Sequence, residues 1–95
     1  MAKGYWIARA DVTVMEAYKA YVAADSPVFE TFGGVFLVRG GQFVAKEGTS
    51  RSRQVVIEFK DYATALACYD SPGYQRAKAF RDGAAEFDLV IVEGA

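Results

Sequence analysis

Short apolar segments recur along the chain with the composition of β-strands. They are rich in aromatic and β-branched residues, which favour extended structure, and glycine or polar residues bound them. We predict strands over residues 5–10, 35–39, 54–60 and 87–92. After the second strand, Gly40 and Gly41 predict a bend or bulge, and residues 42–45 resume an extended pattern. Residues 46–53 are polar without periodicity, which is typical of an exposed loop.

The segment between the first two strands has helical periodicity. Its apolar stripe contains Met15, Tyr18, Val22, Phe29 and Phe32, at spacings of three, four and seven residues. Because the stripe keeps its phase across Pro27, we predict one kinked helix and not two separate helices. A capping box of Thr13 and Glu16 would begin this helix, and Gly33 with Gly34 would end it.

Residues 61–82 predict two helices joined by a sharp corner. Asp61 is placed to cap the first helix. The inner face of that helix would carry Tyr62, Ala65, Leu66 and Tyr69. Ser71 can cap the second helix, and Pro72 takes its first position, where the missing N–H is no loss. The second helix would run to about Asp82, with Gly83 placed to end it.

The predicted order of elements is therefore β-α-β-β-α-β, with the second helical segment divided by the corner. This is the α+β, ferredoxin-like arrangement. Two right-handed crossovers place the helices on one face of a four-stranded antiparallel sheet. At 95 residues, the chain is expected to form one domain over residues 1–95.

The predicted strands are apolar on both faces. In the first strand, Tyr5 and Ile7 oppose Trp6 and Ala8, and the second and fourth strands are similarly two-sided. The helices can cover only one face of the sheet, so the other needs a different cover. We expect a homodimer that packs sheet face on sheet face and buries more than ~1,000 Å².

Composition argues against several classes of function. The net charge is −1, and the eleven Lys and Arg are scattered among twelve acidic residues, which argues against nucleic-acid binding. The longest apolar runs are strand-sized and the chain begins without an apolar targeting core, so we expect no membrane association and a cytoplasmic location. With no histidine and one cysteine, Cys68, we expect no metal and no cofactor, and a reducing compartment.

Several motifs together resemble one bacterial family. They are Gly33-Gly34, Arg39-Gly40-Gly41, Ser71-Pro72 followed by Tyr74-Gln75, Arg81, and the tail from Asp88 to Gly94. This combination spans nearly the whole chain and resembles the bacterial domain of unknown function 1330. The resemblance implies the fold and homodimer of the dimeric α/β-barrel superfamily, whose members include cofactor-independent monooxygenases and muconolactone isomerase-like enzymes. It implies no settled reaction. Family members often carry Arg where this chain has Val35, so an anion site relying on that position would lack its cation here.

The corner between the last two helices supplies the first candidate site. It should bring Tyr69, Tyr74 and Arg81 together, because Tyr74 and Arg81 lie seven residues apart on one helical face. We treat these three residues, with Ser71, as ligand-binding candidates. The alternative is that the tyrosines are ordinary core residues and that Arg81 serves stability alone.

Arg39, Tyr18 and Asp25 are the other candidates. Arg39 ends a strand on the face of Val35 and Leu37, and its guanidinium could bind a carboxylate with two hydrogen bonds or pair with an acid such as Asp25. Tyr18 offers an apolar ring with a hydroxyl at its tip. Asp25 lies in the apolar stripe, where a carboxylate is costly to bury. Either Asp25 meets an arginine in a pocket, or the helix kink turns it into water, and we favour the second.

Two classes of function remain open. The first is binding of a small organic acid or aromatic metabolite in a pocket between sheet and helices. That pocket could also belong to a cofactor-independent, monooxygenase- or isomerase-like enzyme, in which Arg39 and Arg81 stabilise negative charge and a tyrosine or Asp25 moves a proton. The second class is a non-catalytic structural or interaction dimer, which predicts internally paired arginines and a shallow or filled pocket. We favour small-molecule binding.

Overall fold

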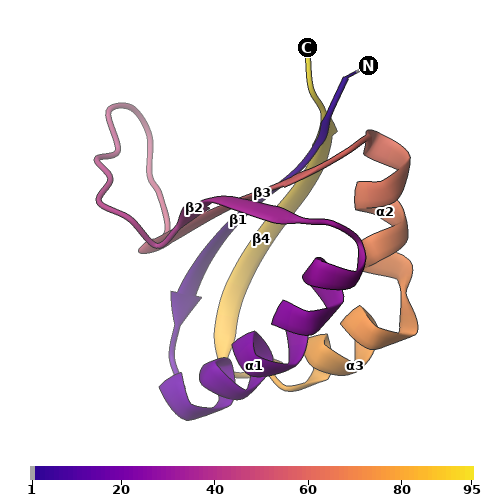
Figure 1. The fold of residues 1–95 in the computed structure, drawn as a ribbon. Coiled ribbons are helices and arrows are strands. Elements are labelled where there is room, and N and C mark those ends of the chain that lie inside the picture. The colour runs from indigo at the N-terminus through magenta and orange to yellow at the C-terminus, as the bar shows by residue number, and fades with distance from the viewer. Residues whose placement is uncertain (1) are drawn as a thin grey trace.

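The computed structural model describes residues 2–95 and contains four strands and three helices in the predicted order (Figure 1). The elements are β1 (Gly4–Val12), α1 (Met15–Thr31), β2 (Val35–Arg39), β3 (Arg53–Phe59), α2 (Tyr62–Asp70), α3 (Pro72–Ala79) and β4 (Ala85–Glu93). All neighbouring strands are antiparallel, in the order β2-β3-β1-β4, and the helices lie on one face of the sheet (Figure 1). The predicted α+β, ferredoxin-like fold is confirmed.

Helix α1 is one helix with Pro27 inside it, as predicted. The predicted capping box is wrong, because the N-cap residue is Val14 and no side chain caps this end. Instead, the backbone amides of Thr13 and Val14 donate to the carbonyl of Ala84 at 2.8 and 3.0 Å, so the turn before β4 fixes the start of α1. At the other end, Gly33 has a φ of 73°, a left-handed conformation that glycine adopts at little cost.

The corner between α2 and α3 forms as predicted. The Ser71 hydroxyl accepts a hydrogen bond from the Tyr74 amide at 3.2 Å and donates one to the Cys68 carbonyl at 2.7 Å. One side chain therefore closes α2 and opens α3, with Pro72 in the first turn of α3. Helix α3 ends at Ala79, earlier than predicted.

Helix α2 is short and capped by Asp61, as predicted. Its predicted inner face is partly wrong. Ala65 and Cys68 are fully buried, whereas Tyr62 and Leu66 are each more than one-third exposed. None of the helices in residues 2–95 is long and apolar enough to cross a membrane.

An irregularity in β2 changes which of its residues face the helices. The pairing with β3 shifts between Phe36 and Val38, so Leu37 is an extra residue in the strand. A one-residue shift moves the following side chains to the opposite face of the sheet. Arg39 therefore shares the helix-facing side with Phe36, and the prediction that it lies on the face of Val35 is wrong.

Residues 40–52 form a loop that projects from the sheet (Figure 1). The extended pattern predicted at 42–45 does not become a strand, because no neighbouring strand pairs with it. Arg51 anchors the end of the loop through salt bridges to Asp11, Glu86 and Asp88 at 3.0, 2.9 and 2.7 Å. This role of Arg51 could not be predicted from the sequence, since its three partners lie on β1 and β4 and meet only in the folded sheet.

The core between sheet and helices is mainly aromatic and centres on Trp6, which is 2% exposed. Its ring packs edge-to-face against Phe29 on α1 and Tyr74 on α3, at centroid distances of 5.0 and 4.9 Å. Its indole N–H donates to the Ala65 carbonyl on α2 at 2.9 Å. Aromatic pairs of this kind contribute roughly 0.5–1.5 kcal/mol beyond the area they bury. One side chain of β1 thus fixes all three helices against the sheet.

The opposite face of the sheet has no cover among residues 2–95. Cross-strand pairs place an apolar row there, which runs through Val38, Val56, Ile7 and Val90. Val90 is 58% exposed, although it lies in the middle of β4. The apolar character predicted for both faces is therefore confirmed, and the helices cover only one of them.

Candidate functional site

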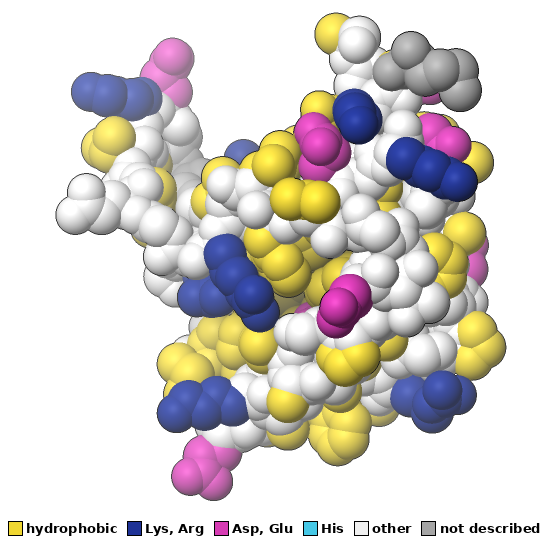
Figure 2. Space-filling model, in the orientation of Figure 1, with side chains coloured by type: hydrophobic (Ala, Val, Ile, Leu, Met, Phe, Trp, Pro, Cys, Tyr) yellow, Lys and Arg dark blue, Asp and Glu magenta, His cyan; other side chains and the backbone are white. Residues whose placement is uncertain are grey.

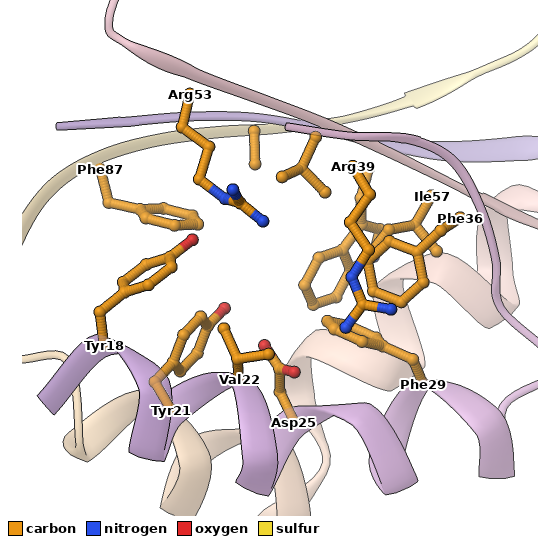
Figure 3. A pocket seen from close by; sticks show the side chains of 13 residues that line it. Tyr18, Tyr21, Val22, Asp25, Phe29, Phe36, Arg39, Arg53, Ile57 and Phe87 are labelled. Atoms are coloured by element: carbon orange, nitrogen blue, oxygen red, sulfur yellow. The ribbon is translucent and has the colours of Figure 1, made fainter. Parts of the chain in front are cut away.

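A pocket opens between α1 and the helix-facing side of the sheet (Figure 3). Its walls are largely aromatic, from Trp6, Tyr18, Tyr21, Phe29, Phe36 and Phe87. Its charged groups are Asp25 on α1, Arg39 at the end of β2 and Arg53 at the start of β3. The space-filling view shows an apolar hollow on this face of the molecule, with basic side chains on one side and an acidic side chain on the other (Figure 2).

The site has a narrow inner chamber and a wider outer groove. The chamber has a volume of about 30 Å³, room for roughly two water-sized groups. The groove, of about 260 Å³, shares Tyr18, Val22 and Arg53 with the chamber and extends along α1 past Met15 and Lys19. The chamber alone is therefore too small for a ring, but the groove beside it has more space.

Asp25 lies in the wall of the chamber and is only 4% exposed. The prediction that a kink turns it into water is wrong, because α1 continues through Pro27 and keeps Asp25 on its buried face. Burial raises the pKa of Asp25 to about 7, against a hydrogen bond from Tyr21 and the charge of Arg39, which both lower it. The Asp25 carboxyl therefore gains and loses its proton near neutral pH.

Arg39 lies at the mouth of the pocket. Its guanidinium stacks over Phe36 at 4.0 Å from the ring centroid and donates to the Ser26 hydroxyl at 3.4 Å. It forms no salt bridge with Asp25 or with any other acid in residues 2–95, so the ion pair considered from the sequence is not formed. Its charge remains available to the pocket.

Arg53 is a pocket residue that the sequence analysis missed, because it was assigned to the exposed loop. It is the first residue of β3, and its guanidinium points into the pocket (Figure 3). Its Nε is buried and has no hydrogen-bond partner among residues 2–95. Gly40, with a φ of 70°, lies against this guanidinium, and any Cβ there would overlap it. The sequence offered one signal for this position. Arg53 lies two residues before Val55, and residues two apart in a strand point to the same face.

Tyr21 is the second pocket residue that was missed. Its ring is 3% exposed, and its hydroxyl lies 2.8 Å from the hydroxyl of Tyr74. Its position four residues before Asp25, on the same helical face, was the available signal.

The candidates predicted from sequence fall into two groups. Tyr18, Asp25 and Arg39 line the pocket, whereas Tyr69, Ser71, Tyr74 and Arg81 do not. The corner does bring together Tyr74 and Arg81, whose guanidinium donates to the Tyr74 hydroxyl at 3.4 Å, and Tyr69 packs against Tyr74 with a centroid distance of 5.2 Å. This cluster is core behind the pocket wall. Residues 2–95 contain no group of three His, Cys, Asp or Glu side chains placed to hold a metal.

Comparison with known proteins identifies a family and a fold. The family described as "Domain of unknown function (DUF1330)" matches residues 3–95, and no curated protein matches. A protein of unknown function from Rhodopseudomonas palustris has a TM-score of 0.78 and 20% identity, covering 99% of this chain and 83% of that one. SnoaB, a cofactor-independent oxygenase from Streptomyces nogalater, has a TM-score of 0.64 and 13% identity, covering 97% and 92%. A dimeric ferredoxin-like protein of unknown function from Thermobifida fusca has a TM-score of 0.62 and 17% identity, covering 99% and 91%.

Asp25→Asn should change how stability depends on pH. Because the folded pKa of Asp25 is raised from 3.8 to about 7, the folded state holds a proton in this range that the unfolded state releases. The free energy of unfolding should therefore fall as pH rises from 4 to 8, by at most on the order of 4 kcal/mol at about 1.4 kcal/mol per pKa unit. Asp25→Asn should remove this fall and be the more stable protein at pH 8.

Urea unfolding across this pH range measures the effect. Glu30→Gln, on the exposed side of the same helix, is the matched control and should keep the wild-type pH dependence. Parallel pH profiles for the wild type and Asp25→Asn would contradict the burial of an ionisable carboxyl at this position.

Proposed function

Because the chain belongs to the family described as Domain of unknown function (DUF1330), which supplies no reaction, we propose a function from the pocket itself: binding of a small organic acid. The acidic group enters the inner chamber, and an aromatic or other apolar body lies in the outer groove. The observation that supports this most is the presence of two guanidinium groups, those of Arg39 and Arg53, around one chamber, with no salt bridge to any acid in residues 2–95.

The groups around the chamber complement an anion. Arginine donates paired hydrogen bonds in a plane that matches a carboxylate, and such charge-assisted bonds are stronger where water is excluded. The hydroxyls of Tyr18 and Tyr21 and the carboxyl of Asp25 enter the pocket from α1 (Figure 3). The Arg53 guanidinium enters from the sheet, and the Arg39 guanidinium reaches down toward α1 (Figure 3). When protonated, Asp25 can also donate a hydrogen bond to a bound carboxylate.

The volumes of the chamber and the groove support a ligand whose acidic group and apolar body occupy different spaces. A chamber of about 30 Å³ accepts a carboxylate or carbonyl oxygen and not a ring. The groove of about 260 Å³ is lined by Val12, Met15 and Val22, which suit an apolar body, and by Lys19. Planar or aromatic acids fit this shape.

A comparison of the two pocket arginines with Arg51 argues against a purely structural role for the pocket. A non-catalytic dimer predicts internally paired arginines. Arg51, which anchors a loop, has three acidic partners. Arg39 and Arg53 have none within residues 2–95, although Asp25 lines the same chamber.

One observation favours a second candidate, a cofactor-independent enzyme. A carboxyl with a pKa near 7 beside two cations is suited to general base catalysis. Asp25 would accept a proton from a substrate carbon or hydroxyl, and Arg39 and Arg53 would stabilise the resulting oxyanion. SnoaB, described as a cofactor-independent oxygenase, has a similar fold, and at 13% identity this similarity concerns the fold alone.

The uncovered face of the sheet is proposed to bind a second copy of the chain. The apolar row of Val38, Val56, Ile7 and Val90 crosses all four strands, and a two-fold axis through it would place each row against its equivalent. The similar protein from Thermobifida fusca is described as dimeric. The homodimer leaves the pocket on the helix side of each sheet accessible.

Arg53→Met should weaken the binding of benzoate, used as the probe acid. Removing a charge-assisted pair of bonds in a buried site should lower affinity about tenfold or more. Nitrogen-15 NMR of the wild type should show benzoate shifting the amide signals of Asp25, Arg39 and Arg53, with benzamide far weaker. Arg76→Met, an exposed change on α3, should bind as the wild type does. Shifts that survive in Arg53→Met, or that map away from these residues, count against the pocket.

Val90→Glu should abolish the proposed homodimer. It places a charge at the β4 end of the apolar row, where association would have to desolvate it. Light scattering after size-exclusion chromatography should give the mass of two chains for the wild type and one for Val90→Glu. Phe80→Glu, at an equally exposed apolar position after α3, is the control and should stay dimeric. A folded wild-type protein with the mass of one chain at micromolar concentration contradicts the proposal.

A further inference from the structure

Arg81 is a cation buried behind the pocket wall. Its side chain is 8% exposed, and its guanidinium carbon lies 4.0 Å from the ring centroid of Phe87 and 5.2 Å from that of Tyr21. Within residues 2–95 it forms no salt bridge, and its Nε has no hydrogen-bond partner. A buried charge is costly unless surrounding groups compensate it. The hydrogen bond that Arg81 donates to the Tyr74 hydroxyl, at 3.4 Å, is one contact that compensates this charge.

That hydrogen bond continues toward the pocket. The Tyr74 hydroxyl lies 2.8 Å from the Tyr21 hydroxyl, and both rings are buried. Tyr21 is four residues before Asp25 on α1, and Figure 3 shows its hydroxyl beside the Asp25 carboxyl. A hydrogen bond from Tyr21 lowers the pKa of Asp25 against the effect of burial. Two hydrogen bonds, and the approach of the Tyr21 hydroxyl to Asp25, thus connect the cation behind the wall with the carboxyl inside the pocket.

The chemistry of the four groups gives this chain a direction. A guanidinium can only donate, so the Tyr74 oxygen accepts from Arg81. Each hydroxyl carries one proton, and either tyrosine can donate to the other. The arrangement that also gives the Asp25 carboxyl a donor has the Tyr74 proton on the Tyr21 oxygen and the Tyr21 proton on Asp25. Hydrogen bonds in series also strengthen one another.

We propose that Arg81 and Tyr74 are positioning residues for Asp25: through Tyr21, they direct a hydroxyl proton onto its carboxyl and stabilise the ionised form inside the pocket. Neither residue lines the pocket, so neither touches the ligand. The inference rests on the proposed function, because the state of Asp25 matters to a ligand only if the acidic group binds beside it.

Other groups also face Asp25. Arg39 on β2 and Ser26 on α1 lower its pKa, and Arg53 on β3 lines the same chamber. On α2, burial and then the charge of Asp25 raise the pKa of the Cys68 thiol. None of these four groups belongs to the hydrogen-bond chain, and all remain in the variants below.

The test is an NMR titration of the Asp25 carboxyl in carbon-13-labelled protein without ligand. The wild type should titrate near pH 7. Tyr74→Phe removes only the linking hydroxyl and should raise the Asp25 pKa by about one unit. Tyr69→Phe is the matched control, because its ring packs against Tyr74 but its hydroxyl is outside the chain, and the Asp25 pKa should not move.

Arg81 variants test the origin of the chain. Arg81→Met should raise the Asp25 pKa at least as far as Tyr74→Phe does, and Arg81→Lys, whose ammonium also only donates, should restore part of the difference. If Arg81→Met does not fold, Tyr74→Phe alone decides. An unchanged Asp25 titration in Tyr74→Phe overturns the proposal, even where Arg81→Met shifts it, since the cation would then act through space.

This result is independent of the benzoate experiment. If benzoate fails to bind while Tyr74→Phe shifts the Asp25 titration, the proposed function fails and the hydrogen-bond chain stands. If benzoate binds at Arg53 and Tyr74→Phe leaves the titration unchanged, only the chain is overturned.

Discussion

The core of this protein buries a carboxyl and a guanidinium and keeps them apart. Asp25 and Arg81 are both almost inaccessible to solvent, and two tyrosine hydroxyls lie between them. A direct ion pair would hold Asp25 in its charged form, since an opposite charge in contact lowers the pKa of an acid. Because Arg81 and Asp25 are separated, burial has a larger effect on the Asp25 carboxyl than the nearby positive charges, and its pKa rises to about 7. The carboxyl that faces the pocket can therefore change its protonation state under ordinary conditions.

The sheet contributes the two arginines of the site, and its strand pairing determines that they face the helices. The shift after Phe36 turns Arg39 toward the helices, and the inward alternation of β3 does the same for Arg53. Gly40 leaves the space that the Arg53 guanidinium occupies. The two cations are thus held opposite α1 on the covered face of the sheet. The uncovered face carries an apolar row instead, so the proposed ligand site and the proposed dimer interface lie on opposite sides of the same strands.

Local signals in the sequence were sufficient for most of the fold. Helical periodicity across Pro27, the Asp61 and Ser71 caps and the four apolar segments each depend on neighbouring residues, and together they define the ferredoxin-like order. The errors arose where a side chain's position depends on distant partners. The extra residue at Leu37 inverted the predicted face of Arg39, and the start of α1 is fixed by the carbonyl of Ala84 and not by its own capping box.

The candidate site was predictable only in part, for the same reason. The positions of its residues on α1 follow from helical periodicity. The inward direction of Arg53 could be predicted only with the true start of β3. The residues of the corner were correctly predicted to lie together, but they lie behind the pocket wall.

Calorimetric titration of benzoate at pH 7, in two buffers with different ionisation enthalpies, measures whether Asp25 gains a proton when an anion binds beside it. A bound anion beside Asp25 raises its pKa further, so binding should take up protons, at most about half a proton per site where the carboxyl is half ionised. We expect this uptake in the wild type and its absence in Asp25→Asn. Benzoate binding to the wild type without proton uptake would contradict this expectation.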